Sequence, residues 1–240
     1  MPPTNARSAT TRDDSVRDRL GRLDPRKHLS PQVKASIKAF LRELSIAGRH
    51  RRGVAQARRL PVGADLKLHV GCGTKHKPGW VNIDLFAIGD VISLDLRRQL
   101  PFPTSSASII YGEHVFEHLD FPGEAQSFLR EALRVLKPGG LLSIGVPDVE
   151  LVLRAYVNND AQYFRHVRRW HAAWCDTHLH QVNFAFRQGN EHKYAYDYET
   201  LAKVVLAAGF VELIRRDHDP NLDSEEWSFG TLYIDARKPG

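Results

Sequence analysis

The segment spanning residues 67–86, KLHVGCGTKHKPGWVNIDLF, constrains the fold of this chain more than any other. It contains two short apolar runs, each of a length typical of a buried strand. The first run ends in Gly71, Cys72 and Gly73, and the second ends in Asp84. Glycine after a strand lets the backbone turn sharply and lets a ligand approach closely, because no Cβ intervenes. A carboxylate that ends the next strand can accept hydrogen bonds from both hydroxyls of a ribose.

The rest of the chain alternates strand patterns with helix patterns, which is typical of an α/β domain with a mainly parallel sheet. Strands are expected at residues 66–71, 80–85, 90–96, 106–114, 141–147, 210–216 and 231–238. Helices are expected at residues 123–140 and 197–209. In the first helix Lys137 lies in the last turn, and the Pro-Gly-Gly that follows ends the helix. In the second helix Asp197 is the expected N-cap and Gly209 lies just past the end.

Basic residues are concentrated near the N-terminus. Residues 1–63 hold 15 Lys and Arg against 5 Asp and Glu, whereas the remaining residues hold 19 against 23. We therefore expect a basic N-terminal helical extension over residues 1–63 and a main domain over residues 64–240. A helix is expected from Ser30, which can cap it, to about Gly48, followed by a basic linker. Its apolar stripe makes a homodimer plausible and consists of Val33, Ile37, Phe40, Leu41 and Leu44.

Composition excludes several classes of protein. Only two cysteines are present, and no apolar run is long enough to span a membrane, so we expect a cytoplasmic protein without stable membrane insertion. The main domain carries no basic surplus, which argues against a nucleic-acid partner.

Two further candidate ligand-binding segments lie at the ends of expected strands. Asp95 follows the third strand, where a side chain can reach an adenine amino group. The sequence YGEHVFEHL follows the fourth strand and places Glu113 and His114 where ligands bind in open α/β sheets.

Four such segments in this order resemble the class I S-adenosylmethionine-dependent methyltransferases. The resemblance covers residues 65–150 strongly and residues 195–240 more weakly. It rests on LHVGCG, VNIDL, LPFP, EHVFEHL, LREALRVLKPGGLLSIGVP and LAAGF. It implies a Rossmann-like, seven-stranded methyltransferase sheet with an antiparallel last strand and helices on both faces. The N-terminal helical extension and a lid insertion at about residues 151–196 would be additions to that fold.

The resemblance also assigns residues to an S-adenosylmethionine site. Gly71, Cys72 and Gly73 would border the methionine part of the cofactor. Asp84, followed by Leu85, would hold the ribose. The remaining assigned residues are Asp95 and Leu96 at the adenine and Glu113 and His114 near the sulfonium.

The connection between the first two strands departs from the family pattern. Gly73 and Asp84 are only 11 residues apart, which is too short for the usual crossover helix. The chain resembles a subgroup with this shortened loop and the sequence GWVNID, associated with modification of glycans and secondary metabolites. The short loop predicts a cofactor pocket that is more open on that side.

Methyl transfer to a hydroxyl requires that its proton leave, and histidine suits that role. His114 is the first candidate for this base. Asp148 would orient the base or the acceptor. Glu113 is also a candidate at the reaction centre, or it could hold the amino group of the cofactor. We expect His118 to point toward the sheet. A divalent cation bound by His171, His192 and the HLHQVN segment is an alternative way to acidify the acceptor.

The polar, aromatic and histidine-rich insertion favours a sugar or oligosaccharide acceptor, although its aromatic residues could equally form a small core of their own. A small aromatic, quinone-like or lipid acceptor remains open. So do a dinucleotide-dependent oxidoreductase and a non-catalytic cofactor-binding module. The missing third glycine argues against the oxidoreductase.

Overall fold

The computed structural model describes residues 29–61, 63, 65–86 and 89–240. The first 28 residues of the predicted N-terminal extension therefore lie outside the described residues. The chain divides into two compact units between Ile46 and Ala47. The second unit contains the sheet and the candidate site.

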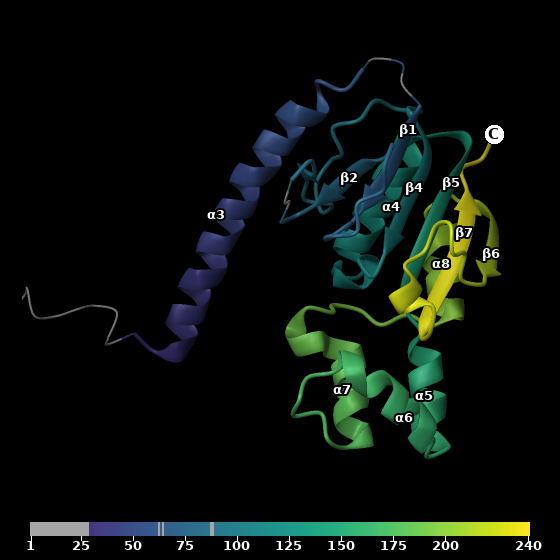
Figure 1. The fold of residues 1–240 in the computed structure, drawn as a ribbon. Helices are drawn as coiled ribbons and strands as arrows, with labels where there is room; N and C mark the ends of the chain where they lie inside the picture. The colour runs from purple at the N-terminus through teal and green to yellow at the C-terminus, as the bar shows by residue number, and fades with distance from the viewer. Residues whose placement is uncertain (1–28, 62, 64, 87–88) are drawn as a thin grey trace, which may run out of the picture. The chain divides into compact units, whose positions relative to one another are not determined.

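The second unit is built on one seven-stranded sheet with the strand order β3-β2-β1-β4-β5-β7-β6 (Figure 1). The strands are β1 (Leu66–Val70), β2 (Val81–Asp84), β3 (Ile92–Ser93), β4 (Ala107–Glu113), β5 (Leu136–Pro147), β6 (Val211–Arg216) and β7 (Thr231–Arg237). The five strands from β3 to β5 pair in parallel, and β7 runs antiparallel to both β5 and β6. The predicted seven-stranded sheet with an antiparallel last strand is therefore confirmed.

The sheet interior is apolar, as expected for parallel strands covered by helices. The α-helices are α3 (Pro31–Ala57), α4 (Gly123–Val135), α5 (Val149–Val157), α6 (Ala161–Val167), α7 (His178–Arg187) and α8 (Tyr198–Ala207). The buried face of α4 consists of Ala125, Phe128, Leu129, Ala132 and Val135. No helix among the described residues is long and apolar enough to cross a membrane.

The boundary between α4 and β5 differs from the prediction. The helix ends at Val135, and Leu136 already has the extended angles φ −62° and ψ 143°. Leu136 pairs with Ala107 of β4, so the residues predicted to end the helix begin the next strand. The Lys137 ammonium donates to the Asp65 carboxylate at 2.7 Å. Strand pairing thus overrides the helical signal of this segment.

The N-terminal capping signals of two helices are confirmed. The backbone N–H of Val33 donates to the Ser30 hydroxyl at 3.3 Å at the start of α3. The backbone N–H of Thr200 donates to the Asp197 carboxylate at 2.8 Å at the start of α8.

The predicted basic linker after residue 48 is wrong, because α3 continues to Ala57. Within the second unit, His50, Gly53 and Ala57 lie at helical spacing. The ring of His50 accepts the backbone N–H of Asp95 at 3.1 Å. A Cβ on Gly53 would lie 2.0 Å from the Ser93 carbonyl oxygen, so only glycine fits this contact. Packing against the β3 edge therefore keeps this basic segment helical.

The predicted apolar stripe of α3 lies in the first unit. Its five side chains, from Val33 to Leu44, are all exposed. The homodimer that this stripe suggested stays a prediction.

The insertion after β5 is helical and forms its own small core. Figure 1 shows α5, α6 and α7 grouped together beyond the end of the sheet. Helices α5 and α6 form the buried cluster, and α7 packs against it through the partly buried Val182 and Ala185. The cluster consists of Val152, Ala155, Tyr163, Phe164 and Val167.

Candidate functional site

The loop after β1 is held against the end of β2. The backbone N–H of Gly73 donates to the Asp84 carboxylate at 2.9 Å, and that of Cys72 donates to the Ile83 carbonyl at 3.0 Å. Gly71 and Gly73 have positive φ angles of 65° and 50°, which favour glycine. A Cβ on Gly71 would lie 2.5 Å from Val115, whereas a Cβ on Gly73 would meet nothing within 4 Å. Gly71 is thus required by packing, and Gly73 faces open space.

The Asp84 carboxylate accepts hydrogen bonds from the backbone after β1 and from the backbone after β2. Its second carboxylate oxygen accepts the backbone N–H of Phe86 at 2.8 Å. Each oxygen therefore has one backbone donor and retains capacity for another. Leu85 follows in the turn and is half-buried.

Cys72 is buried, and burial raises the pKa of its thiol to about 11, so this cysteine is a packing residue and not a nucleophile.

The short loop between β1 and β2 contacts the connection between β6 and β7. The Lys77 ammonium donates to the Leu222 carbonyl, and the Lys75 ammonium lies 2.8 Å from the Glu226 carboxylate. Lys77 also lies over the ring of Tyr111, with its nitrogen 4.8 Å from the ring centre. The β6–β7 connection therefore contacts this loop through Leu222 and Glu226. The more open cofactor pocket that the short loop suggested stays a prediction.

Asp95 is buried in the loop after β3, and its carboxylate is engaged by arginines. Arg97 donates two side-chain hydrogen bonds to it, at 2.8 and 3.0 Å, and Arg98 donates a third at 3.3 Å. Burial alone would raise the pKa of Asp95, but the hydrogen bonds from Arg97 outweigh it and hold this pKa below its usual value. An adenine amino group would have to share this carboxylate with Arg97. Leu96, the other residue assigned to adenine, is half-buried beside it.

Glu113 ends β4 and is buried. Its carboxylate accepts the Tyr233 hydroxyl at 2.7 Å and the backbone N–H of Ser224 at 3.2 Å. Burial lowers the pKa of Lys77, and the nearby Glu113 charge opposes that shift. In this structure Glu113 therefore anchors β7 and the β6–β7 connection.

His114 has the positive φ angle of 52°, which is uncommon outside glycine. Its backbone N–H donates to the Gly145 carbonyl at 2.8 Å, which fixes the turn after β4. Its Nε2 lies 2.9 Å from the Thr231 hydroxyl, and its ring packs on Trp227 with centres 4.4 Å apart. The side chain is 19% exposed, so part of it is accessible to solvent.

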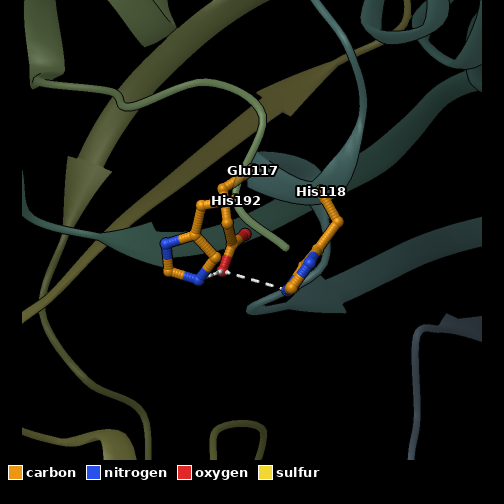
Figure 2. A group of neighbouring side chains, drawn as sticks. All are labelled: Glu117, His118 and His192. Carbon is orange, nitrogen blue, oxygen red and sulfur yellow. Dashed lines mark ion pairs between the residues drawn. The ribbon is translucent and has the colours of Figure 1, made fainter. Parts of the chain in front are cut away.

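Glu117 lies behind His114 and is 2% exposed. Its Oε1 is 3.5 Å from Nδ1 of His114, 4.0 Å from Nε2 of His118 and 3.9 Å from Nε2 of His192. Neither carboxylate oxygen has a hydrogen-bond partner. Burial would raise the pKa of Glu117, but the histidines, His114 first, hold it below its usual value. Figure 2 shows the carboxylate facing the rings of His118 and His192.

The expectation that His118 points toward the sheet is wrong. Its side chain is 33% exposed and faces His192, with ring centres 5.1 Å apart. Glu117 occupies the inward position instead. The short 3₁₀ turn at Phe116–His118 turns Phe116 and Glu117 inward and leaves His118 at the rim.

Asp148 directly follows β5 and caps α5. One carboxylate oxygen accepts the backbone N–H of Leu151 at 3.2 Å, and the other accepts Arg215 at 2.9 Å. Among the described residues, no hydrogen bond or ion pair joins Asp148 to His114.

The histidines of the insertion are not brought together. The ring of His171 packs on Phe184 at 4.9 Å, and that of His178 stacks on Phe164 at 4.1 Å. His180 pairs with Asp176 at 2.7 Å on the surface. Each therefore has a local partner, and only His192 joins the group around Glu117, the one group of potential metal ligands found among the described residues.

Sequence reasoning missed Glu117, Trp227 and Lys77 as members of this region. The signal for Glu117 was the repeated Glu-His pair in EHVFEH, which places a second acid three residues after His114. Trp227 and Lys77 carried no such signal, because both come to the region through loops.

The chain is similar to known proteins in part of its sequence and in its fold. Residues 86–144 match the family model described as a methyltransferase domain. No curated protein matches the chain by sequence.

Solved structures resemble the chain at low identity. A SAM-dependent methyltransferase from Archaeoglobus fulgidus is 18% identical, with 82% of this chain and 94% of that chain covered and a TM-score of 0.45. Phosphoethanolamine N-methyltransferase 2 from Haemonchus contortus, solved with S-adenosyl-L-methionine, is 11% identical, with 79% and 53% covered and a TM-score of 0.45. The CurJ carbon methyltransferase is 14% identical, with 76% and 51% covered and a TM-score of 0.43. The chain thus spans about half the length of the last two proteins.

The strand order and the antiparallel β7 decide the fold. The chain has the Rossmann-like fold of the class I methyltransferases.

Proposed function

We propose that this protein is an S-adenosylmethionine-dependent O-methyltransferase that transfers a methyl group to a hydroxyl of a sugar or oligosaccharide. The observation that carries the proposal is the contact between the Gly73 N–H and the Asp84 carboxylate at 2.9 Å. It aligns the glycine turn with an acid at the ends of β1 and β2. The match of residues 86–144 to a methyltransferase domain supports the same activity.

The residues at the ends of β1 and β2 suit this cofactor. Asp84 retains acceptor capacity on both oxygens for two ribose hydroxyls. The open space beside Gly73 suits the methionine part, since a Cβ there would meet nothing within 4 Å. Leu85 and Leu96 offer apolar edges, and Asp95 would exchange one arginine contact for the adenine amino group.

The cofactor, when bound, supplies a methyl group activated by the sulfonium. In such a transfer the acceptor oxygen would gain the methyl carbon as the carbon–sulfur bond breaks, so the hydroxyl proton would have to leave to a base. His114 would take this proton, since its ring is partly exposed beside the end of β4. Thr231 and Glu117 contact its two ring nitrogens and would orient it. Asp148 caps α5, the first helix of the insertion, and accepts a hydrogen bond from Arg215. It would thereby help to position the insertion.

The rings around His114 are compatible with a sugar acceptor. Trp227 packs on His114, and Trp170 lies 6.0 Å from Trp227 between ring centres. Aromatic faces of this kind suit the apolar face of a sugar, although they also suit a flat aromatic acceptor. The shortened loop and its motifs resemble those of the mycobacterial 1-O-methyltransferase of methylmannose polysaccharide synthesis. The homodimer and the cytoplasmic location remain predictions from the sequence.

Calorimetric titration with S-adenosylhomocysteine tests the proposal. We expect micromolar binding to the wild-type protein, loss of binding in Asp84→Ala, and unchanged binding in Asp90→Ala, which alters an exposed acid nearby. A screen of sugar hydroxyls, phenols and lipid head groups then tests the acceptor. Binding of NADH or NADPH instead would point to an oxidoreductase, and cofactor binding without turnover on any acceptor would point to a binding module.

A further inference from the structure

The group formed by Glu117, His118 and His192 contains buried polar atoms that lack partners. Both carboxylate oxygens of Glu117 and Nε2 of His192 make no hydrogen bond. Glu117 is 2% exposed, and the His192 side chain is 6% exposed. When the histidines that face it are neutral, Glu117 is a buried carboxylate with neither a hydrogen bond nor a counter-charge, which is costly, so this arrangement calls for a cation between the groups.

The hydrogen bonds of the two histidines determine which ring nitrogen faces the carboxylate. His118 donates from Nδ1 to the Glu191 carbonyl at 3.1 Å, and His192 donates from Nδ1 to the Ala185 carbonyl at 2.8 Å. A carbonyl oxygen only accepts, so Nδ1 carries the proton in both rings. In the neutral rings each Nε2 therefore turns a lone pair toward Glu117. Metal-binding histidines are commonly held by this kind of backbone contact.

The spacing of the donor atoms also fits an ion. Each of the three residues offers one possible ligand atom, and these three atoms all lie within 4.8 Å of one another. The separations of 3.9 and 4.0 Å from the carboxylate oxygen are too long for hydrogen bonds. Metal–ligand bonds of about 2.0–2.2 Å place tetrahedral ligand atoms roughly 3.3 Å apart, so a small inward movement would close the site.

We propose that Glu117, His118 and His192 bind a divalent transition-metal cation such as Zn²⁺. Two imidazoles and one carboxylate are a donor set that zinc and its neighbours in the transition series prefer, whereas Mg²⁺ and Ca²⁺ favour oxygen ligands. The ligands come from the turn after β4 and from the segment before α8. The ion would therefore join the insertion to the sheet.

Three protein ligands leave at least one coordination position for water or a substrate oxygen. His118 is 33% exposed, so the site opens toward solvent on its side. His114, whose Nδ1 lies 3.5 Å from Glu117, adjoins the site. An oxygen on the ion would be acidified next to the candidate base. The binding proposal itself does not depend on methyl transfer.

Metal binding can be measured directly on the full chain after treatment with a chelator. We expect one Zn²⁺ or Co²⁺ per chain by calorimetry with a dissociation constant below about 10 μM, visible absorption of the Co²⁺ form, and a higher melting temperature. Glu117→Gln, His118→Asn and His192→Asn should each weaken binding at least 10-fold. His118→Asn changes a side chain at the rim and is the variant expected to keep the fold.

The matched controls are His180→Asn and Asp176→Asn, which alter an exposed pair at 2.7 Å. Both should bind the ion like the wild type. Absence of Zn²⁺ and Co²⁺ binding to the wild type, or unchanged binding in folded His118→Asn and His192→Asn, would overturn the proposal. Titration of the same samples with S-adenosylhomocysteine separates failure of the metal site from failure of the proposed function.

Discussion

Gly73, in the turn after β1, donates its backbone N–H to the carboxylate of Asp84 at the end of β2 at 2.9 Å, although no helix connects these two strands. A loop of TKHKPG replaces that helix, and the contact still joins the glycine turn to the acid. The usual helix N-terminus is therefore not needed to form this part of the candidate site.

The two glycines of this turn should respond differently to alanine. Gly71→Ala brings a Cβ to 2.5 Å from Val115 and should lower the free energy of unfolding by about 3 kcal/mol. Gly73→Ala keeps open space and should cost about 1 kcal/mol from its left-handed backbone. It should nevertheless weaken S-adenosylhomocysteine binding. Urea unfolding and calorimetry measure the two quantities, and equal destabilisation by both changes would contradict this account.

His114 should matter for turnover and not for cofactor affinity. His114→Asn retains a residue that tolerates a positive φ angle and removes the base, so kcat should fall about 100-fold or more. Cofactor affinity should stay within about 3-fold of wild type, because His114 contacts Thr231, Glu117 and Trp227 and not the glycine turn. His180→Asn is the control. Unchanged kcat on a confirmed acceptor would exclude His114 as the base.

The Asp95 carboxylate should contribute stability at neutral pH. Asp95→Asn weakens its contacts with Arg97 and Arg98 and should lower the free energy of unfolding by about 2 kcal/mol at pH 7. The folded pKa is lowered, so this contribution is present above the unfolded pKa of about 4 and is lost as pH falls through the folded pKa. Urea unfolding at pH 7 and pH 3 should show a smaller difference at the lower pH. The exposed Asp90→Asn should show little difference at either pH.

The β6–β7 connection should depend on the pair of Arg216 and Asp223. The Asp223 carboxylate is fully buried and accepts Arg216 at 2.8 Å. Arg216→Ala leaves this carboxylate without its counter-charge and should cost about 3 kcal/mol. Arg216→Lys should rescue only part of this loss, because lysine cannot make the two parallel hydrogen bonds.

The control for this pair is Arg237→Ala, which removes a half-exposed contact with Glu212 at 3.7 Å and an exposed hydrogen bond to the Gly139 carbonyl at 2.9 Å. It should cost less than about 1 kcal/mol. Thermal and urea unfolding of the three variants measure their losses in the free energy of unfolding, which should be largest in Arg216→Ala. A loss in Arg216→Ala no larger than in Arg237→Ala would show that the buried pair does not hold the connection.

Local sequence signals predicted the elements whose boundaries depend on short-range chemistry. Ser30 and Asp197 cap their helices as expected, and Gly209 follows α8 with a φ angle of 100°. The same signals failed where distant strands compete for the chain. Leu136 belongs to β5 because Ala107 pairs with it, and residues 48–57 stay helical because His50 and Gly53 pack on the loop and strand at the β3 edge.

The sequence by itself determined the seven-stranded sheet and the order of the residues at its strand ends, because apolar periodicity and glycine turns act over a few residues. Only the tertiary structure decided which side chains meet there. Glu117 and His192 are 75 residues apart, and Trp227 reaches His114 through the β6–β7 connection. Such contacts depend on how the sheet, the insertion and the loops pack, and no spacing along the chain encodes that packing.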